Sequence, residues 1–305
     1  MKYEELLRLL ENKLNNLKSS YKLLLPDNSW VTEAIDNVKN LIIAKQNKIP
    51  EKEYFNREEL LYQKTVTSLS ELHDLNRIIS FLEKVDKENL KVYLKKLKIV
   101  FNAPLLLMNE NSNSNEPRNI MFELRFFSRF KEKEYATKLC LDHPDILVNT
   151  NNNEYAVECK RIFQPETLID NTKDAINQLL KYSLNEQRRY GVVALSITRF
   201  FHSGNKRFEA KSENAARLRL NYEMRKLVED NKDELLKPFT LKIPLLILEY
   251  SDCAVIDKPY NITLHDFIET ANGRPSLFYK VLKDFNKFNE NLSVTYYNSP
   301  GTIIH

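Results

Sequence analysis

Glycine is scarce in this chain, with only 4 glycines among 305 residues. Folds that bind nucleotide phosphates through glycine-rich loops need several glycines at fixed spacing, because the backbone must approach the phosphate closely. Neither the GxGxxG pattern nor the GxxxxGK[ST] pattern occurs anywhere in the sequence. The nucleotide and cofactor classes that depend on those loops are therefore excluded.

The composition is that of a globular protein, with 42% hydrophobic and 29% charged residues. The net charge of +4 permits a polyanionic partner without requiring one. The cysteines Cys140, Cys159 and Cys253 show no CxxC spacing, which argues against a disulfide framework or a zinc ribbon. No apolar signal-peptide segment follows Met1, and no apolar run reaches membrane-spanning length. We therefore expect a cytoplasmic protein without a membrane partner.

The first hundred residues have the periodicity of amphipathic helices. We expect up to five helices, over 3–24, 31–42, 57–64, 68–85 and 87–101. Asp86 is placed to cap the last of them. The apolar stripe over 3–24 suits a coiled-coil seam or a bundled helix, and its length of about three heptads favours the bundle. We predict a helical N-terminal domain over 1–108, whose helices are candidates for docking a protein partner or a second copy.

A polar stretch over 109–118 is interpreted as a linker, and a mixed α/β pattern follows it. The core over 119–198 is expected to contain, in order, a helix, three strands, a helix and a strand, at 119–132, 135–141, 145–149, 155–163, 168–185 and 192–197. Beyond the core we expect a helix, two strands, a helix and a last strand, at 210–232, 243–250, 253–257, 276–289 and 292–297. The second predicted domain therefore spans 119–305 and belongs to the α/β class.

An acid and a base interrupt the apolar strand that contains Tyr155. Because side chains alternate along a strand, Glu158 and Lys160 share one face. One interpretation is an edge strand with an ion pair on its surface. The other is a site in which Glu158 binds a divalent metal and Lys160 faces the substrate. Asp145 follows Pro144 and opens the preceding strand, a position where aspartate is also a common turn residue.

Glu123 lies beside the apolar stripe of the helix over 119–132, three residues after Ile120 and four before Phe127. Burial of a lone carboxylate is costly, so this side chain should either reach solvent or bind a positive group. A solvated position at the edge of the stripe is the simpler interpretation.

Together these side chains have the composition of a phosphodiesterase site. Carboxylates of Glu123, Asp145 and Glu158 could hold one or two magnesium ions, which activate water and neutralise the phosphate. Lys160 could orient the water or offset charge in the transition state. No metal-ligand spacing is visible among the five histidines, His73, His143, His202, His265 and His305.

Pro144-Asp145 followed by Glu158-Cys159-Lys160 on the next strand resembles the motif of the PD-(D/E)XK nuclease superfamily. Glu123 sits where many members carry an additional metal-site acid. The resemblance covers about residues 119–198 and implies a restriction-endonuclease-like αβββαβ core with an N-terminal α-helical domain and a C-terminal α/β extension. It also implies a Mg²⁺- or Mn²⁺-dependent nuclease.

Gln178-Leu-Leu-Lys-Tyr182 is similar to the QxxxY motif of the RecB-like and lambda-exonuclease-like branch of that superfamily. A spacing of four puts Gln178 and Tyr182 on one helix face. The resemblance implies that both contact metal-bound water or a substrate phosphate. Alternatively, Tyr182 packs in the core and Gln178 is a surface residue.

Bases and aromatic residues are mixed in the segment that follows the core. The candidate nucleic-acid contacts are Arg199, Lys206, Arg207, Lys211 and Arg217. Such a surface could bind phosphates and stack on unpaired bases. The alternative is a solvated helix preceded by a loop whose phenylalanines pack in the core.

The sequence therefore predicts a metal-dependent nuclease, with DNA preferred over RNA as the expected substrate. A ribonuclease of the same fold is one alternative, and a nucleic-acid-binding or assembly module without catalysis is another. The sequence contains all four residues expected for catalysis, which argues against the inactive module. They are Glu123, Asp145, Glu158 and Lys160. Restriction, phage defence and DNA repair are roles suggested by fold analogy alone.

Overall fold

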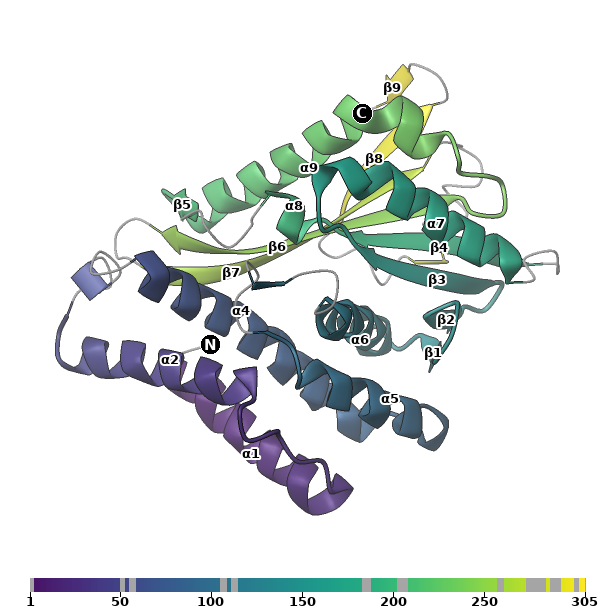
Figure 1. Ribbon diagram of the computed structural model, residues 1–305. Coiled ribbons are helices and arrows are strands. Elements are labelled where there is room, and N and C mark those ends of the chain that lie inside the picture. Colours follow the sequence, from purple (N-terminus) through teal and green to yellow (C-terminus); the bar gives the residue numbers. More distant parts are fainter. Residues whose placement is uncertain are drawn as a thin grey trace. The chain divides into compact units, whose positions relative to one another are not determined.

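The computed structural model describes residues 3–49, 53–54, 59–104, 109–110, 115–182, 188–201, 208–256, 261–272, 284–285, 292–298 and 302–304. They form a mixed α/β protein (Figure 1). The chain divides into two compact units. The first contains Met1–Arg125, His202–Ala216 and Asp252–His265, and the second contains Phe126–Phe201, Arg217–Ser251 and Asp266–His305.

Helices make up most of the described part of the first unit. They are α1 (Tyr3–Tyr21), α2 (Trp30–Gln46), α4 (Glu59–Phe81), α5 (Lys87–Val100) and the start of α6 (Glu116–Glu132). α1, α2 and α4 pack against one another, and each contributes a fully buried leucine, namely Leu10, Leu41 and Leu72. The apolar stripe of α1 therefore faces a helix bundle.

The predicted cap of α5 is confirmed, because the Asp86 side chain accepts a hydrogen bond from Asn89 N at 2.9 Å. The prediction of separate helices over 57–64 and 68–85 is wrong, since α4 runs unbroken through Thr65-Val66-Thr67. β-branched residues disfavour a helix, but Thr65 donates its hydroxyl to Leu61 O at 2.8 Å and Val66 is buried. Packing therefore outweighs local propensity here.

The second unit is built on a mixed sheet. Its strands include β1 (Ala136–Leu139), β2 (Ile146–Asn149), β3 (Glu154–Arg161), β4 (Arg189–Ser196) and the first part of β6 (Leu245–Ile256). β1, β2 and β3 are joined antiparallel, whereas β3, β4 and β6 run parallel. The strand order then continues through β7 (Asn261–Asn272), β8 (Leu292–Asn298) and β9 (Thr302–Ile304).

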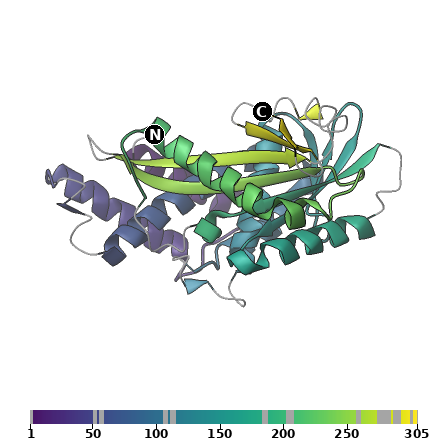
Figure 2. The same cartoon turned by 90° about the horizontal axis from the view of Figure 1, so that it is seen from above.

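The helix α7 (Leu168–Lys181) connects β3 to β4 and covers both strands on one face, which Figures 1 and 2 show from two directions. Gly191 of β4 lies under this helix. A Cβ there would come within 3.2 Å of Leu179 Cδ1 and 2.9 Å of Ile243 Cγ1, so the close packing requires glycine. The contact anchors the C-terminal part of α7 to the sheet.

The predicted order of helix, three strands, helix and strand is observed as α6, β1, β2, β3, α7 and β4. α6 begins at Glu116, inside the predicted linker, of which residues 111–114 lie outside the described part of the chain.

Several predictions beyond residue 198 were incomplete or wrong. The two strands expected over 243–250 and 253–257 are the single strand β6. Three strands were not predicted, namely β5 (Phe208–Ala210), β7 and β9. α8 (Thr198–Phe201) was also missed, and α9 (Glu213–Leu236) matches the expected charged helix. Only 284–285 of the helix predicted over 276–289 are described. No helix among the described residues has the length and apolar character needed to cross a membrane.

Candidate metal-binding and catalytic site

Glu158 is the most deeply buried acid of the predicted site. It lies in the middle of β3, between β2 and β4, and its side chain is 0% exposed. The interpretation of β3 as an edge strand with a surface ion pair is therefore wrong. A buried carboxylate is costly unless it is paired with positive groups or donors. The groups that contact the Glu158 carboxylate therefore bear on what this site can bind.

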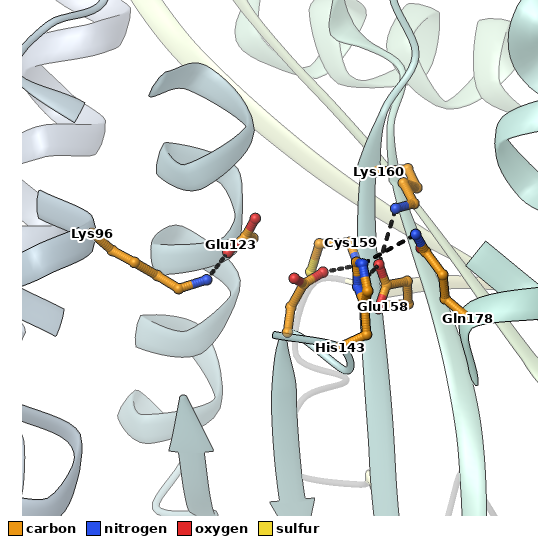
Figure 3. Close-up of polar contacts among 8 residues, drawn as sticks. Lys96, Glu123, His143, Glu158, Cys159, Lys160 and Gln178 are labelled. Carbon is orange, nitrogen blue, oxygen red and sulfur yellow. Dashed lines mark hydrogen bonds and ion pairs between the residues drawn. The ribbon is translucent and has the colours of Figure 1, made fainter. Parts of the chain in front are cut away.

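Two side chains meet one oxygen of Glu158, as Figure 3 shows. Lys160 Nζ lies 3.0 Å from Glu158 Oε1, and His143 Nδ1 lies 2.9 Å from the same atom. Glu158 and Lys160 share a face of β3, as their spacing predicts. Lys160 is 21% exposed and His143 is 49% exposed, so both reach solvent from a buried acid. The carboxylate itself is buried, and its two partners extend from it to the protein surface.

Asp145 holds the second carboxylate at the start of β2. Its side chain is largely buried, and Oδ2 accepts a hydrogen bond from Cys159 N at 2.7 Å. The backbone of Cys140 donates to Asp145 O at 2.9 Å and closes the loop before β2. Because Ile146 pairs with Val157, Asp145 falls beside Glu158 across the two strands. The register of β2 and β3 therefore brings the two acids together.

His143, Asp145 and Glu158 form a cluster suited to a metal ion, hereafter the HDE cluster. One ligand atom from each residue can be chosen so that all lie within 4.8 Å of one another. An ion at about 2.0–2.3 Å from each ligand fits such a spacing. One nitrogen and two carboxylate donors, two of the residues being buried, are an appropriate donor set for a divalent cation.

Gln178 and Tyr182 make different contacts. Gln178 Nε2 lies 3.1 Å from His143 Nε2, so Gln178 joins the cluster through the histidine (Figure 3). The Tyr182 ring lies under the guanidinium of Arg189, with 5.1 Å between Arg189 Cζ and the ring centroid. Arg189 is paired with Glu154, four residues before Glu158 along β3. The structure brings only the glutamine of the predicted motif to the HDE cluster by a described contact.

Glu123 belongs to the first unit, where its carboxylate forms a buried ion pair with Lys96 of α5. Figure 3 shows the two side chains pointing toward each other. Glu123 is only 7% exposed, so the simpler interpretation of a solvated edge position is wrong. The expectation that a buried Glu123 binds a positive group is confirmed, since Lys96 is that group. Its role as a metal ligand stays a prediction.

The predicted nucleic-acid contacts are spread over several elements. Arg199 of α8 stacks on Phe163 with 3.6 Å between Cζ and the ring centroid, whereas Lys211 and Arg217 are exposed. Lys206 and Arg207 lie outside the described residues.

Two of the nearby phenylalanines pack against the rest of the protein. Phe201 stacks on Tyr250 with ring centroids 5.0 Å apart, and Phe208 is buried. These two rings follow the packing interpretation rather than the base-stacking one.

His143 is the site residue that sequence reasoning missed, because the histidines show no ligand spacing among themselves. The available signal was its position two residues before Asp145. In comparisons with known proteins, no family model matches the chain and no curated protein matches it. The chemistry of the HDE cluster and its neighbours is therefore the basis for inferring function.

Proposed function

We propose that this protein is a metal-dependent nuclease that hydrolyses phosphodiester bonds of DNA. The observation that supports this most strongly is the meeting of Asp145 and Glu158 beside the ammonium of Lys160. Two acids and a lysine at one point match the requirements of phosphodiester hydrolysis, namely a held cation and a positive group near the phosphate.

Each residue has a distinct task in this proposal. Asp145 and Glu158 hold Mg²⁺ or Mn²⁺, and Glu123 is proposed as an additional metal-site acid. When bound, such an ion acts as a Lewis acid on the phosphate and lowers the pKa of a coordinated water. Lys160, held 3.0 Å from Glu158 Oε1 and partly exposed, orients the attacking water and offsets negative charge as it builds up on the phosphate.

The order of elements also supports the proposal. α6, β1, β2, β3, α7 and β4 follow one another as the resemblance to PD-(D/E)XK nucleases implies. Asp145 directly precedes β2, Glu158 and Lys160 lie on β3, and Gln178 lies on α7. These are the element types that the resemblance assigns to them. We therefore propose that residues 119–198 form a restriction-endonuclease-like core.

RNA is the second candidate substrate, because metal-assisted hydrolysis of a phosphodiester does not in itself distinguish the two nucleic acids. A binding or assembly module without catalysis is the alternative of another class. The cluster argues against it, since a degenerate site would lack an acid or the lysine.

A cleavage panel tests the proposal. The full chain is incubated with supercoiled, linear and single-stranded DNA and with RNA, with Mg²⁺ or Mn²⁺ and with excess chelator. We expect metal-dependent cleavage of at least one DNA form and a lower rate on RNA. Cleavage of RNA alone would favour the ribonuclease. An absence of cleavage on every substrate with either metal would favour the inactive module.

A further inference from the structure

We propose that His143 is the third protein ligand of the metal and that it makes the site select transition ions over Mg²⁺. This inference rests on the proposed function in that it concerns the same ion. The proposed nuclease needs only the two carboxylates and Lys160. The imidazole adds a donor of a different chemical class.

The position of the ring carries the argument. His143 Nδ1 faces Glu158 Oε1 at 2.9 Å, and the ring belongs to the group whose ligand atoms lie within 4.8 Å of one another. His143 lies in the loop that the Cys140–Asp145 backbone hydrogen bond closes. This loop also delivers Asp145. The loop thus holds the nitrogen and the carboxylate of Asp145, and β3 supplies Glu158 beside them.

The second nitrogen of the ring, Nε2, has a partner that favours one tautomer of the neutral ring. Gln178 Nε2 lies 3.1 Å from His143 Nε2, and an amide nitrogen can only donate. In this arrangement His143 Nε2 accepts, so the proton of a neutral ring lies on Nδ1 and is donated to Glu158 Oε1. Binding of a metal through Nδ1 requires the other tautomer, with the proton on Nε2.

Gln178 can accept a hydrogen bond from His143 Nε2–H in that second tautomer without any movement of its backbone. Its amide oxygen Oε1 is buried and has no hydrogen-bond partner among the described residues. A rotation of the carboxamide by half a turn would present this oxygen to His143 Nε2–H. A histidine ligand commonly donates its other ring N–H to such an acceptor, which fixes the ring and strengthens its donor nitrogen. Gln178 is therefore a positioning residue.

The donor set determines which ions are favoured. Mg²⁺ prefers oxygen donors and retains several waters, whereas imidazole nitrogen suits the later first-row transition ions. A site of two carboxylates and one imidazole should therefore gain more affinity for Co²⁺ than for Mg²⁺ from the nitrogen. Removal of the imidazole should reverse this preference in part.

Calorimetric titration of the full-length, metal-free protein with Co²⁺ and, separately, with Mg²⁺ tests the proposal. We expect His143→Ala to weaken Co²⁺ binding by about tenfold or more and Mg²⁺ binding by less than about threefold. Gln178→Met, which keeps the side-chain length and removes the amide, should weaken Co²⁺ binding by about tenfold. Asp142→Ala is the matched control, because Asp142 is an exposed acid in the same loop outside the HDE cluster.

Unchanged Co²⁺ affinity in His143→Ala would overturn the proposal, and so would an equal loss for both ions. Because His143 is 49% exposed, the variant should remain folded, which its thermal unfolding checks. A wild-type protein that cleaves DNA while His143→Ala binds Co²⁺ normally would refute this inference alone. Co²⁺ binding that depends on His143, without cleavage of any substrate, would refute the proposed nuclease alone.

Discussion

At the scale of single residues, Glu158 places a negative charge inside the protein, and this charge must be offset when no metal is bound. Its oxygen Oε1 is shared by Lys160 and His143 at 3.0 and 2.9 Å, so neighbouring donors offset the negative charge in the buried strand. Asp145 relies instead on the backbone N–H of Cys159. The two acids are thus stabilised by different means, and replacing each of them should have different consequences.

Replacement of Asp145 by asparagine should separate metal binding from folding. Asparagine retains an oxygen that accepts the Cys159 N–H bond, but it removes the charge that attracts the cation and repels Glu158. We expect Asp145→Asn to lower Mn²⁺ affinity by about tenfold or more while the melting temperature of the metal-free protein is kept or raised. Calorimetry and thermal unfolding measure the two effects. Equal Mn²⁺ affinity in wild type and Asp145→Asn would refute Asp145 as a ligand.

At the scale of elements, the buried Lys96–Glu123 ion pair links α5 to α6. Both side chains are more than nine-tenths buried, so removing one partner leaves a desolvated charge. We expect Lys96→Met and Glu123→Leu each to lower the free energy of unfolding by about 3–5 kcal/mol, and the double variant to lose less than their sum. Urea unfolding measures all three.

A further variant of Glu123 tests its role as a metal-site acid. Glu123→Gln should lower Mn²⁺ affinity if the carboxylate also serves the metal. Unchanged Mn²⁺ affinity together with a large loss of stability would restrict Glu123 to its ion pair with Lys96.

His73 of α4 should make the stability of the protein depend on pH. Burial lowers the pKa of His73 below 6.5, with Arg77 and Arg125 acting in the same direction and Asp74 opposing them. The unfolded state therefore binds the proton more readily, so this contribution is fully present above pH 6.5 and is lost as the pH falls toward the folded-state pKa. We expect His73→Gln to reduce the slope of the unfolding free energy between pH 7 and pH 5. Identical slopes in urea titrations would contradict this.

The sequence predicts an element well where the spacing of its apolar residues matches the face that the element buries. β2, β3 and α7 were found because apolar alternation and helical spacing coincide with their burial. The polar pair Ser251-Asp252 lies between the two strands expected over 243–250 and 253–257, yet β6 runs through both residues. β7 carries several polar residues and has no clear alternation, so its pairing in the sheet could not be anticipated.

The sequence predicts several residues of the candidate site, but it does not predict all of their contacts. Asp145, Glu158 and Lys160 could be chosen because the strand period places an acid and a base on one face. His143 could not, because its contact with Glu158 depends on how the loop over 140–145 folds. The partner of Glu123 was equally hidden, since Lys96 is distant in sequence and looks like any other lysine of a charged helix.

At the scale of the whole molecule, the HDE cluster, Lys160 and Gln178 all belong to the second compact unit. They come from the loop before β2, from β3 and from α7, within a short stretch of the chain. The first unit contributes α1, α2, α4, α5 and the Lys96–Glu123 pair. Apart from Glu123, the residues proposed for catalysis therefore come from one unit, and a single substitution there tests the proposal.

The rate of DNA cleavage by Lys160→Ala is the most direct test of the proposed activity. His143 remains within reach of Glu158 in this variant, so we expect it to fold and to bind DNA as the wild type does. Single-turnover cleavage with Mg²⁺ or Mn²⁺ should be slower by about a hundredfold or more, because one charge-stabilising group is lost. Lys173→Ala, at an exposed position of α7, should cleave at the wild-type rate. A Lys160→Ala protein that cleaves as fast as the wild type would contradict the account.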